Sequence, residues 1–229
     1  MRAILIFVLV ICLNSCQIKI DNPNILVIYV DDLGYCDSEL YGCTKIPTPN
    51  IKRLGEEGVL FTQGYVSSPV CSPSRAGLLT GRYQQRFGHE FLPSSAPDSQ
   101  LGLPLDETTL ADALKKTGYV TGIVGKWHLG VHERFHPNNR GFETFYGILT
   151  ATTDYIDPTR QDVRYWVPVY EGYQIPDPYK DSPWQGRNDR PVMRGKTVVE
   201  ENDYLTEAFS REAVNFINKN SGRPFFLYL

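Results

Sequence analysis

The sequence has 229 residues, of which 41% are hydrophobic and 21% charged, an ordinary composition for a globular protein. That length suits one large domain or two small ones. The formal net charge of -3 argues against nucleic acid as a partner, although local basic groups remain able to bind a small anion.

The first sixteen residues combine one positive charge, an apolar stretch and a cysteine. Arg2 precedes an apolar stretch, Ala3 to Leu13, which is too short to cross a bilayer as a helix. The segment Leu13-Asn14-Ser15-Cys16 resembles a lipobox, in which Cys16 takes the lipid. We therefore expect a signal peptide over residues 1–15, a membrane attachment only through the lipid on Cys16, and a location in the periplasm or at the cell surface. A secretory signal cleaved nearby is the alternative.

Three cysteines follow this leader, namely Cys36, Cys43 and Cys71. Export permits disulfides, and Cys36 and Cys43 lie close enough in sequence to pair, but the spacing does not decide whether they do. Their spacing matches no zinc-binding pattern. Cys71 is the odd cysteine.

The next segments predict a strand and then a helix. Residues 24–30 form a short β-branched run, which is typical of a buried parallel strand. Thr48-Pro49 has the pattern of a helix N-cap followed by proline in the first turn. We expect Ile51 and Leu54 to lie on the buried face of that helix.

A second helix and strand are expected from residue 108 onward. Thr108 or Thr109 provides an N-cap, Gly118 provides a stop, and the inward-facing residues are expected to be Leu110, Ala113 and Leu114. Residues 119–124 then read as a strand that leads to Lys126 and His128.

The last third of the chain contains an aromatic-rich insertion and one more helix and strand. Residues 151–200 hold many Pro, Asp, Arg and aromatic residues without periodicity, and predict a structured insertion near a cleft. Residues 204–219 form an amphipathic helix, and residues 224–229 a strand. The alternation predicts an α/β fold with a largely parallel central sheet flanked by helices. Because the chain stops within a strand, we expect residues 16–229 to be the N-terminal part of a longer catalytic domain.

Asp31 and Asp32 follow the first strand directly. Ligands of open α/β sheets bind at this end of the strands, and two adjacent carboxylates repel one another unless a cation lies between them. Hard oxygen ligands suit calcium or magnesium. A solvated turn explains the same pair without any metal.

Cys71-Ser72-Pro73-Ser74-Arg75 is the second candidate site. Pro73 fits the first turn of a helix, so Cys71 is expected near a helix N-terminus, where free amides favour an anion. Arg75 lies one turn further on and can reach back over that end. The alternative without a functional role is an inert buried cysteine beside a surface arginine.

Lys126 and His128 form the third candidate site. Alternation along an extended segment places both side chains on one side. Lysine offers a charge to an anionic substrate, and histidine exchanges protons near neutral pH. For an isolated pair, a surface lysine and a structural histidine are the simpler explanation.

In order and spacing, these motifs resemble the type I sulfatase family of the alkaline-phosphatase superfamily. The most specific parts are the pentad 71–75 with Leu79-Thr80-Gly81-Arg82. The resemblance is extended by Asp31-Asp32-Leu33-Gly34-Tyr35, by Gly125-Lys126-Trp127-His128-Leu129-Gly130, and by His136-Pro137 leading to Arg140-Gly141-Phe142. It covers residues 24–229.

The resemblance implies a hydrolase of sulfuric esters. Cys71 would be oxidised to formylglycine by a separate formylglycine-generating (maturase) enzyme. Asp31, Asp32 and the modified residue 71 would bind a divalent cation, calcium or else magnesium. Arg75 would hold the hydrated aldehyde, and His128 would orient or stabilise that hydrate. Lys126 would contact the sulfate. The other metal ligands and the leaving-group acid of the family have no counterpart here.

The resemblance also implies a sulfated carbohydrate or an aryl sulfate as substrate. Aromatic and basic residues of the insertion are candidates for sugar contacts, although they can equally serve its packing: Tyr155, Arg160, Arg164, Tyr165 and Trp166. Residues 85–89 are expected to line the cleft. Two alternatives remain open at this point, a phosphodiester or phosphonate monoester hydrolase of the same superfamily and a truncated, non-catalytic lipoprotein that binds glycans.

Overall fold

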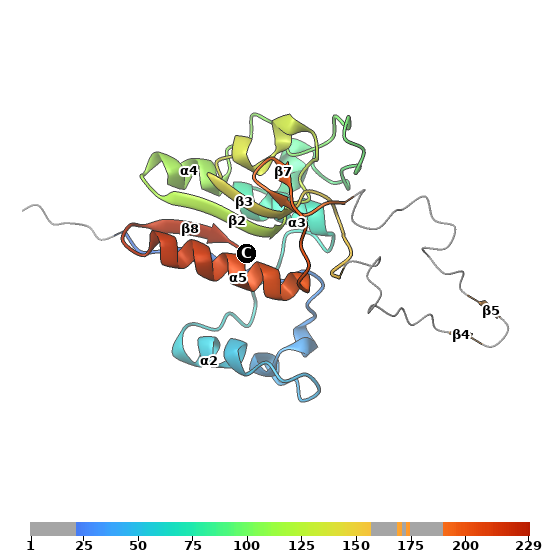
Figure 1. The fold of residues 1–229 in the computed structure, drawn as a ribbon. Coiled ribbons are helices and arrows are strands. Elements are labelled where there is room, and N and C mark those ends of the chain that lie inside the picture. Colours follow the sequence, from blue (N-terminus) through green and yellow to red (C-terminus); the bar gives the residue numbers. More distant parts are fainter. Residues whose placement is uncertain (1–21, 157–168, 171–172, 175–189) are drawn as a thin grey trace, which may run out of the picture.

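The computed structural model of the protein describes residues 22–156, 169–170, 173–174 and 190–229 (Figure 1). The expected signal peptide and Cys16 therefore lie outside the described residues. The same holds for four of the five candidate sugar-contact residues, Arg160, Arg164, Tyr165 and Trp166.

A six-stranded mixed sheet forms the centre of the molecule, with strand order β1-β8-β2-β3-β6-β7. The first four strands in that order are mutually parallel, and the last two pair antiparallel. The strands are β1 (Ile25–Val27), β2 (Val120–Lys126), β3 (Thr144–Ile148), β6 (Met193–Arg194), β7 (Thr197–Val198) and β8 (Phe225–Tyr228). A separate hairpin consists of β4 (Val169–Tyr170) and β5 (Tyr173–Gln174). The expected α/β class with a largely parallel sheet is confirmed.

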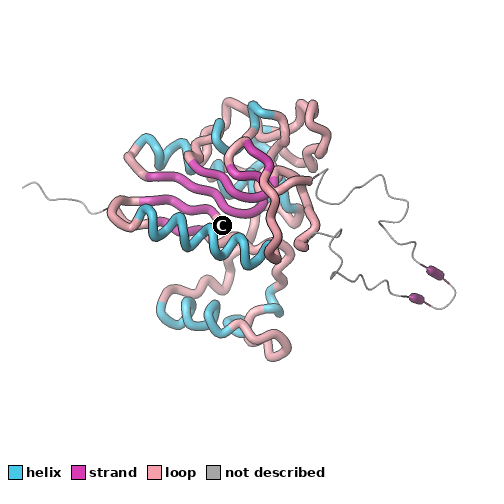
Figure 2. The backbone as a smooth tube through the Cα atoms, viewed as in Figure 1, coloured by secondary structure: helices cyan, strands magenta, loops and turns pink. Residues whose placement is uncertain are grey.

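Helices cover both faces of this sheet, as Figure 2 shows in cyan against magenta strands. The α-helices are α2 (Pro49–Glu57), α3 (Cys71–Thr80), α4 (Leu110–Lys116) and α5 (Leu205–Asn220). Five short 3-10 turns span Tyr35–Asp37, Glu39–Tyr41, Gln84–Phe87, Glu133–Phe135 and Pro137–Asn139. Among the described residues, no helix combines the length and apolar character needed to cross a membrane.

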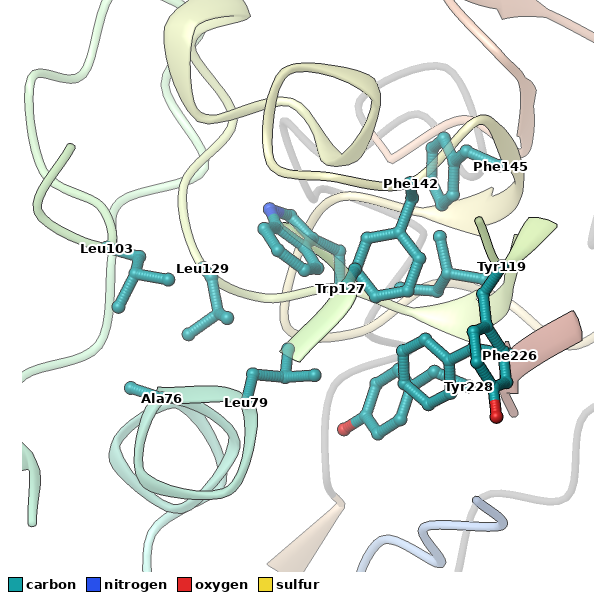
Figure 3. Close-up of a cluster of buried hydrophobic side chains, with 12 residues drawn as sticks. Ala76, Leu79, Leu103, Tyr119, Trp127, Leu129, Phe142, Phe145, Phe226 and Tyr228 are labelled. Atoms are coloured by element: carbon teal, nitrogen blue, oxygen red, sulfur yellow. The ribbon is translucent and has the colours of Figure 1, made fainter. Parts of the chain in front are cut away.

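The sheet is apolar on both faces because its strand residues alternate between two cores. One core packs strand side chains such as Val124 and Leu227 against α5, through Leu205 and Phe216. The other core packs the opposite face against α3, α4 and the loops after β2, and Figure 3 shows most of its side chains. The central parallel strands are thus buried on both sides, as their continuous apolar runs predict.

A pair of glycines sets the spacing between β2 and β3. Gly125 and Gly147 lie opposite one another in the parallel register. Their φ angles are 106° and 150°, and a Cβ added to Gly147 would lie 1.9 Å from the Gly125 carbonyl oxygen. Only glycine fits both the backbone angles and this close approach. The pair lies at the carboxyl ends of the strands, immediately before the site residues.

Two expectations about buried helix faces were wrong. Helix α2 begins at Pro49 as predicted, but Ile51 and Leu54 are exposed. The helix lies below α5 in Figure 1, away from the sheet, and it packs instead against the 3-10 turn Glu39–Tyr41 through Leu40. In α4, Ala111 is buried whereas Ala113 is exposed.

A capping box at Thr109 begins α4 at a predicted N-cap, so the second difference comes from packing: the backbone of Ala111 and Asp112 lies directly against Gly141. Thr109 Oγ1 accepts a hydrogen bond from the Asp112 amide at 3.0 Å, and the Asp112 carboxylate accepts one from the Thr109 amide at 3.0 Å. This reciprocal cap fixes where the helix begins.

Candidate active site

Helix α3 brings Cys71 to the carboxyl end of the sheet. Val70 is the extended N-cap, Cys71 is the first helical residue, and Gly81 ends the helix in the left-handed conformation at φ 64°. Pro73 occupies the first turn, where its missing N–H costs no hydrogen bond. The predicted position of Cys71 at a helix N-terminus is confirmed. The Cys71 thiol is free and partly buried.

Arg75 contacts residues of β2, of β8 and of the segment after β1 at the centre of the site. Its guanidinium donates to Asp31 Oδ2 at 2.8 Å, to the Lys126 carbonyl at 2.7 Å and to the Tyr228 hydroxyl at 3.3 Å. It also lies over the Tyr29 ring, 5.4 Å from its centroid. The side chain is only 3% exposed, which excludes the alternative of a surface arginine.

Asp31 is the anion that two cations share. Its Oδ2 lies 2.8 Å from Lys126 Nζ and 2.8 Å from an Arg75 nitrogen. Partial burial alone would raise the pKa of Asp31, but hydrogen bonds and charges from Lys126 and Arg75 outweigh burial and hold the pKa below its ordinary value. Asp31 is therefore ionised near neutral pH.

His128 faces the cysteine from the loop after β2. Its Nδ1 lies 3.3 Å from Cys71 Sγ, and its side chain is almost fully buried. Burial, and then the charges of Lys126 and Arg75, lower its pKa to about 4, so the imidazole is neutral at pH 7.

The predicted convergence of Lys126 and His128 on the site holds, but the predicted alternation does not explain it. Strand β2 ends at Lys126, and His128 has a left-handed backbone with φ 55°. Such a conformation costs a residue other than glycine about 1–3 kcal/mol, which the surrounding contacts must offset.

Asp32 adjoins Asp31 and is exposed, again with a left-handed backbone at φ 55°. Both aspartates line one cavity of about 480 Å³, together with Arg75, Lys126 and Tyr155. In the described ranges, no group of three or more His, Cys, Asp and Glu side chains is arranged to hold a metal ion. Asp31 and Asp32 thus offer two carboxylate groups at this edge, a donor type that suits a divalent cation. Two carboxylates are fewer ligands than such a cation takes.

Sequence reasoning missed Tyr29 and Tyr228, and it did not assign the roles of Ser72 and His89. The Tyr228 hydroxyl accepts a hydrogen bond from Arg75. The Tyr29 hydroxyl forms a hydrogen bond with the Ser74 hydroxyl. Ser72 and His89 lie behind the cysteine, where both are fully buried. The expectation that residues 85–89 line the cleft is therefore wrong for His89.

The two other cysteines among the described residues take no part in this cluster. Cys36 and Cys43 both carry free thiols in the structure, so the disulfide considered between them is not formed.

Comparisons with known proteins identify the family. Residues 23–229 match the family model for sulfatases. Mouse arylsulfatase G is 36% identical over 94% of this chain and 42% of its own length, and human N-acetylgalactosamine-6-sulfatase is 37% identical over 90% and 38%. The chain belongs to the sulfatase family. The resemblance seen in the sequence motifs is thereby confirmed, and members of this family use a formylglycine and a metal ion.

A solved structure shows the same fold for this sulfatase chain. The crystal structure of Ps i-CgsB in complex with a neocarrahexaose superimposes with a TM-score of 0.76 and 38% identity, covering 91% of this chain and 44% of that one. The chain spans about two fifths of the length of the curated relatives it matches, 42% and 38% for the two named above.

Proposed function

We propose that the protein hydrolyses sulfate esters of carbohydrates, with residue 71 as nucleophile after conversion of Cys71 to formylglycine. One observation carries the proposal. In a chain of the sulfatase family, Arg75 and Lys126 converge on Asp31, and Cys71 contacts His128, which follows Lys126 by two residues at the carboxyl edge of the sheet.

Charge is the first requirement of the reaction that these residues meet. A sulfate ester is an anion and repels an attacking oxyanion, so positive groups must offset the repulsion. Lys126 is partly exposed at 17% and can turn toward a bound sulfate, whereas Arg75 is buried and held by four partners. We therefore assign substrate contact to Lys126 and the orientation of residue 71 to Arg75.

Proton handling is the second requirement, and it falls to His128. Its neutral imidazole places Nδ1 beside residue 71, where a ring nitrogen can accept the proton of a hydroxyl. The low pKa keeps this nitrogen available across the neutral range. Formylglycine, once formed by the separate maturase, supplies the hydrated aldehyde whose hydroxyl attacks sulfur.

Asp31 and Asp32 are the residues assigned to a divalent cation, calcium in preference to magnesium, together with the modified residue 71. The cation would supply Lewis-acid stabilisation of the sulfate charge. The donor chemistry of the two carboxylates supports this assignment. Lys126 and Arg75 already contact Asp31, so they share with the cation the task of balancing its charge.

Sulfated carbohydrates are favoured as substrates over the alternatives. The relatives named above include a sulfatase of N-acetylgalactosamine 6-sulfate and a structure solved with a carrageenan-type hexasaccharide. A phosphodiester or phosphonate monoester hydrolase finds no comparable support, and a non-catalytic glycan-binding lipoprotein does not account for the assembled nucleophile and cations. Tyr155, which lines the cavity, remains a candidate for sugar contact.

The leader supports an exported lipoprotein, anchored only through lipid on Cys16 and located in the periplasm or at the cell surface. This assignment depends on residues 1–16 of the sequence alone.

A Cys71→Ala variant of the complete protein tests the nucleophile. We expect it to lose turnover of an aryl sulfate, with Cys36→Ala as a matched control that removes an exposed free thiol and keeps activity. Peptide mass spectrometry should show residue 71 of the active protein as the aldehyde. Substantial turnover by Cys71→Ala would refute the nucleophile assignment, and turnover of an aryl phosphodiester above that of the sulfate would favour the other hydrolase class.

A further inference from the structure

We propose that His89 is a positioning residue, which acts through Ser72 to hold His128 against residue 71. The inference deepens the proposed function and rests on it for its catalytic consequence. The decisive observation is a buried chain of contacts from the His89 ring, through the Ser72 hydroxyl, to the backbone of His128.

The hydroxyl of Ser72 connects the two histidines. Ser72 Oγ donates to the His128 carbonyl at 2.7 Å and lies 2.8 Å from His89 Nε2. A hydroxyl has one proton, and that proton points to the carbonyl, so the Ser72 oxygen accepts from His89 Nε2–H. The direction of every hydrogen bond in the chain follows from this count.

The surroundings of His89 favour the protonation state that this chain requires. The ring is fully buried, and burial lowers its pKa to about 4, with a smaller opposing effect from the Gly102 carbonyl. A neutral imidazole carries one ring proton, which the contact with Ser72 places on Nε2. Phe91 packs against the ring at 4.6 Å between centroids and limits its rotation.

The other end of the chain is a strained residue that needs support. His128 has a left-handed backbone with φ 55°, unusual for a residue other than glycine. Its amide donates to the Leu149 carbonyl at 3.1 Å, and its carbonyl accepts from Ser72. Both sides of the residue are therefore fixed, and the fixed backbone aims Nδ1 at Cys71 Sγ, 3.3 Å away.

Helix α3 thus holds His128 at two points with consecutive residues. Cys71 meets the imidazole, and Ser72 holds the carbonyl of the same residue. His89 occupies the acceptor side of the serine hydroxyl and so keeps its proton directed to His128. Loss of His89 frees the hydroxyl to rotate and the strained backbone to relax.

His89→Leu in the complete, matured protein tests this role, since residue 89 lies outside the pentad that a maturase would read. We expect kcat on an aryl sulfate to fall about tenfold or more while KM stays within about twofold. Each kcat is first corrected for the fraction of residue 71 that has been converted to the aldehyde. His89→Gln, which restores a donor near Nε2, should recover most of that loss. Cys36→Ala, at an exposed free thiol outside this chain of contacts, is the control that should retain wild-type kcat.

Crystal structures of the unmatured protein, which still carries Cys71, provide a second test that does not depend on activity. In His89→Leu, and in Ser72→Ala if the first variant does not fold, the separation between Cys71 Sγ and His128 Nδ1 should exceed hydrogen-bond range. A variant that keeps the 3.3 Å approach and the left-handed His128 backbone overturns the proposal. So does a kcat loss that glutamine fails to rescue. A wild-type protein that releases no sulfate refutes the proposed function, whereas the crystal structures still decide the role of His89.

Discussion

Lys126 is the residue whose removal separates catalysis from stability most cleanly. In Lys126→Met the methylene stem is preserved and the charge at the end of β2 is lost. If Lys126 contacts the substrate sulfate, its loss removes one positioned positive group from the transition state. Single groups of this kind are worth about 2.7–4 kcal/mol, so kcat should fall about 100-fold to 1000-fold.

Folding should suffer far less from the same substitution. Lys126 Nζ lies 2.8 Å from Asp31 Oδ2, but Arg75 lies 2.8 Å from that same oxygen and remains after the change. The carboxylate therefore keeps a partner, and the repulsion between two neighbouring cations disappears. Asp31 is also 32% exposed, so solvent screens the pair. We expect the free energy of unfolding to change by about 1 kcal/mol or less.

The assay compares kcat and KM on an aryl sulfate with the urea midpoint of unfolding for each variant. Lys115→Met is the matched control, because Lys115 pairs with Glu143 at 3.8 Å on the surface and does not line the cavity that contains Asp31 and Lys126. Aldehyde content of residue 71 is measured in every preparation. A folded, matured Lys126→Met protein with kcat within about threefold of wild type would refute the assignment of substrate contact to Lys126.

Three other predictions concern the cation and the scaffold. Chelation followed by desalting should abolish aryl sulfate turnover and added Ca²⁺ should restore it; turnover that persists after verified metal removal contradicts the cation assignment. Arg140→Met should lower the unfolding free energy by about 2–4 kcal/mol, because the buried guanidinium donates to three backbone carbonyls that would lose their partner; an unchanged urea midpoint argues against this. Gly147→Ala should cost at least about 2 kcal/mol because its Cβ would meet the Gly125 carbonyl, while Gly222→Ala, with open space around it, should be neutral in thermal unfolding.

Local patterns in the sequence predicted the elements that carry the site. The run 24–30 predicted β1, Pro73 marked the first turn of α3, and residues 119–124 predicted β2 close to its observed bounds. The expectation of a buried strand over 24–30 was wrong, because β1 spans only Ile25–Val27 and lies at the edge of the sheet, where Leu26 is exposed. These signals depend on neighbouring residues alone, namely β-branching, proline position and caps. The antiparallel strands β6 and β7 lacked such a signal, because two-residue strands are too short to show periodicity.

Contacts between distant segments explain what the sequence could not reveal. Arg75 and Tyr228 are separated by 153 residues, and Ser72 and His128 by 56, so no local pattern reports either pair. The pentad identified Arg75 as a functional residue, but not the four partners that bury it. Equally, the left-handed turn that aims His128 at residue 71 follows from backbone contacts with Ser72 and Leu149 rather than from alternation along a strand.

The same reasoning explains why the candidate metal centre is the least defined part of the site. Adjacent carboxylates are easy to recognise in a sequence, but a cation needs ligands that converge from several segments. In the part of the chain that the structure describes, Asp31 and Asp32 supply the carboxylate edge, and Asp31 is engaged by Lys126 and Arg75. A cation bound there would replace part of the positive charge that these two side chains now provide. The charge balance at Asp31 therefore links the predicted effects of Lys126→Met and of chelation, and each should be measured in the background of the other.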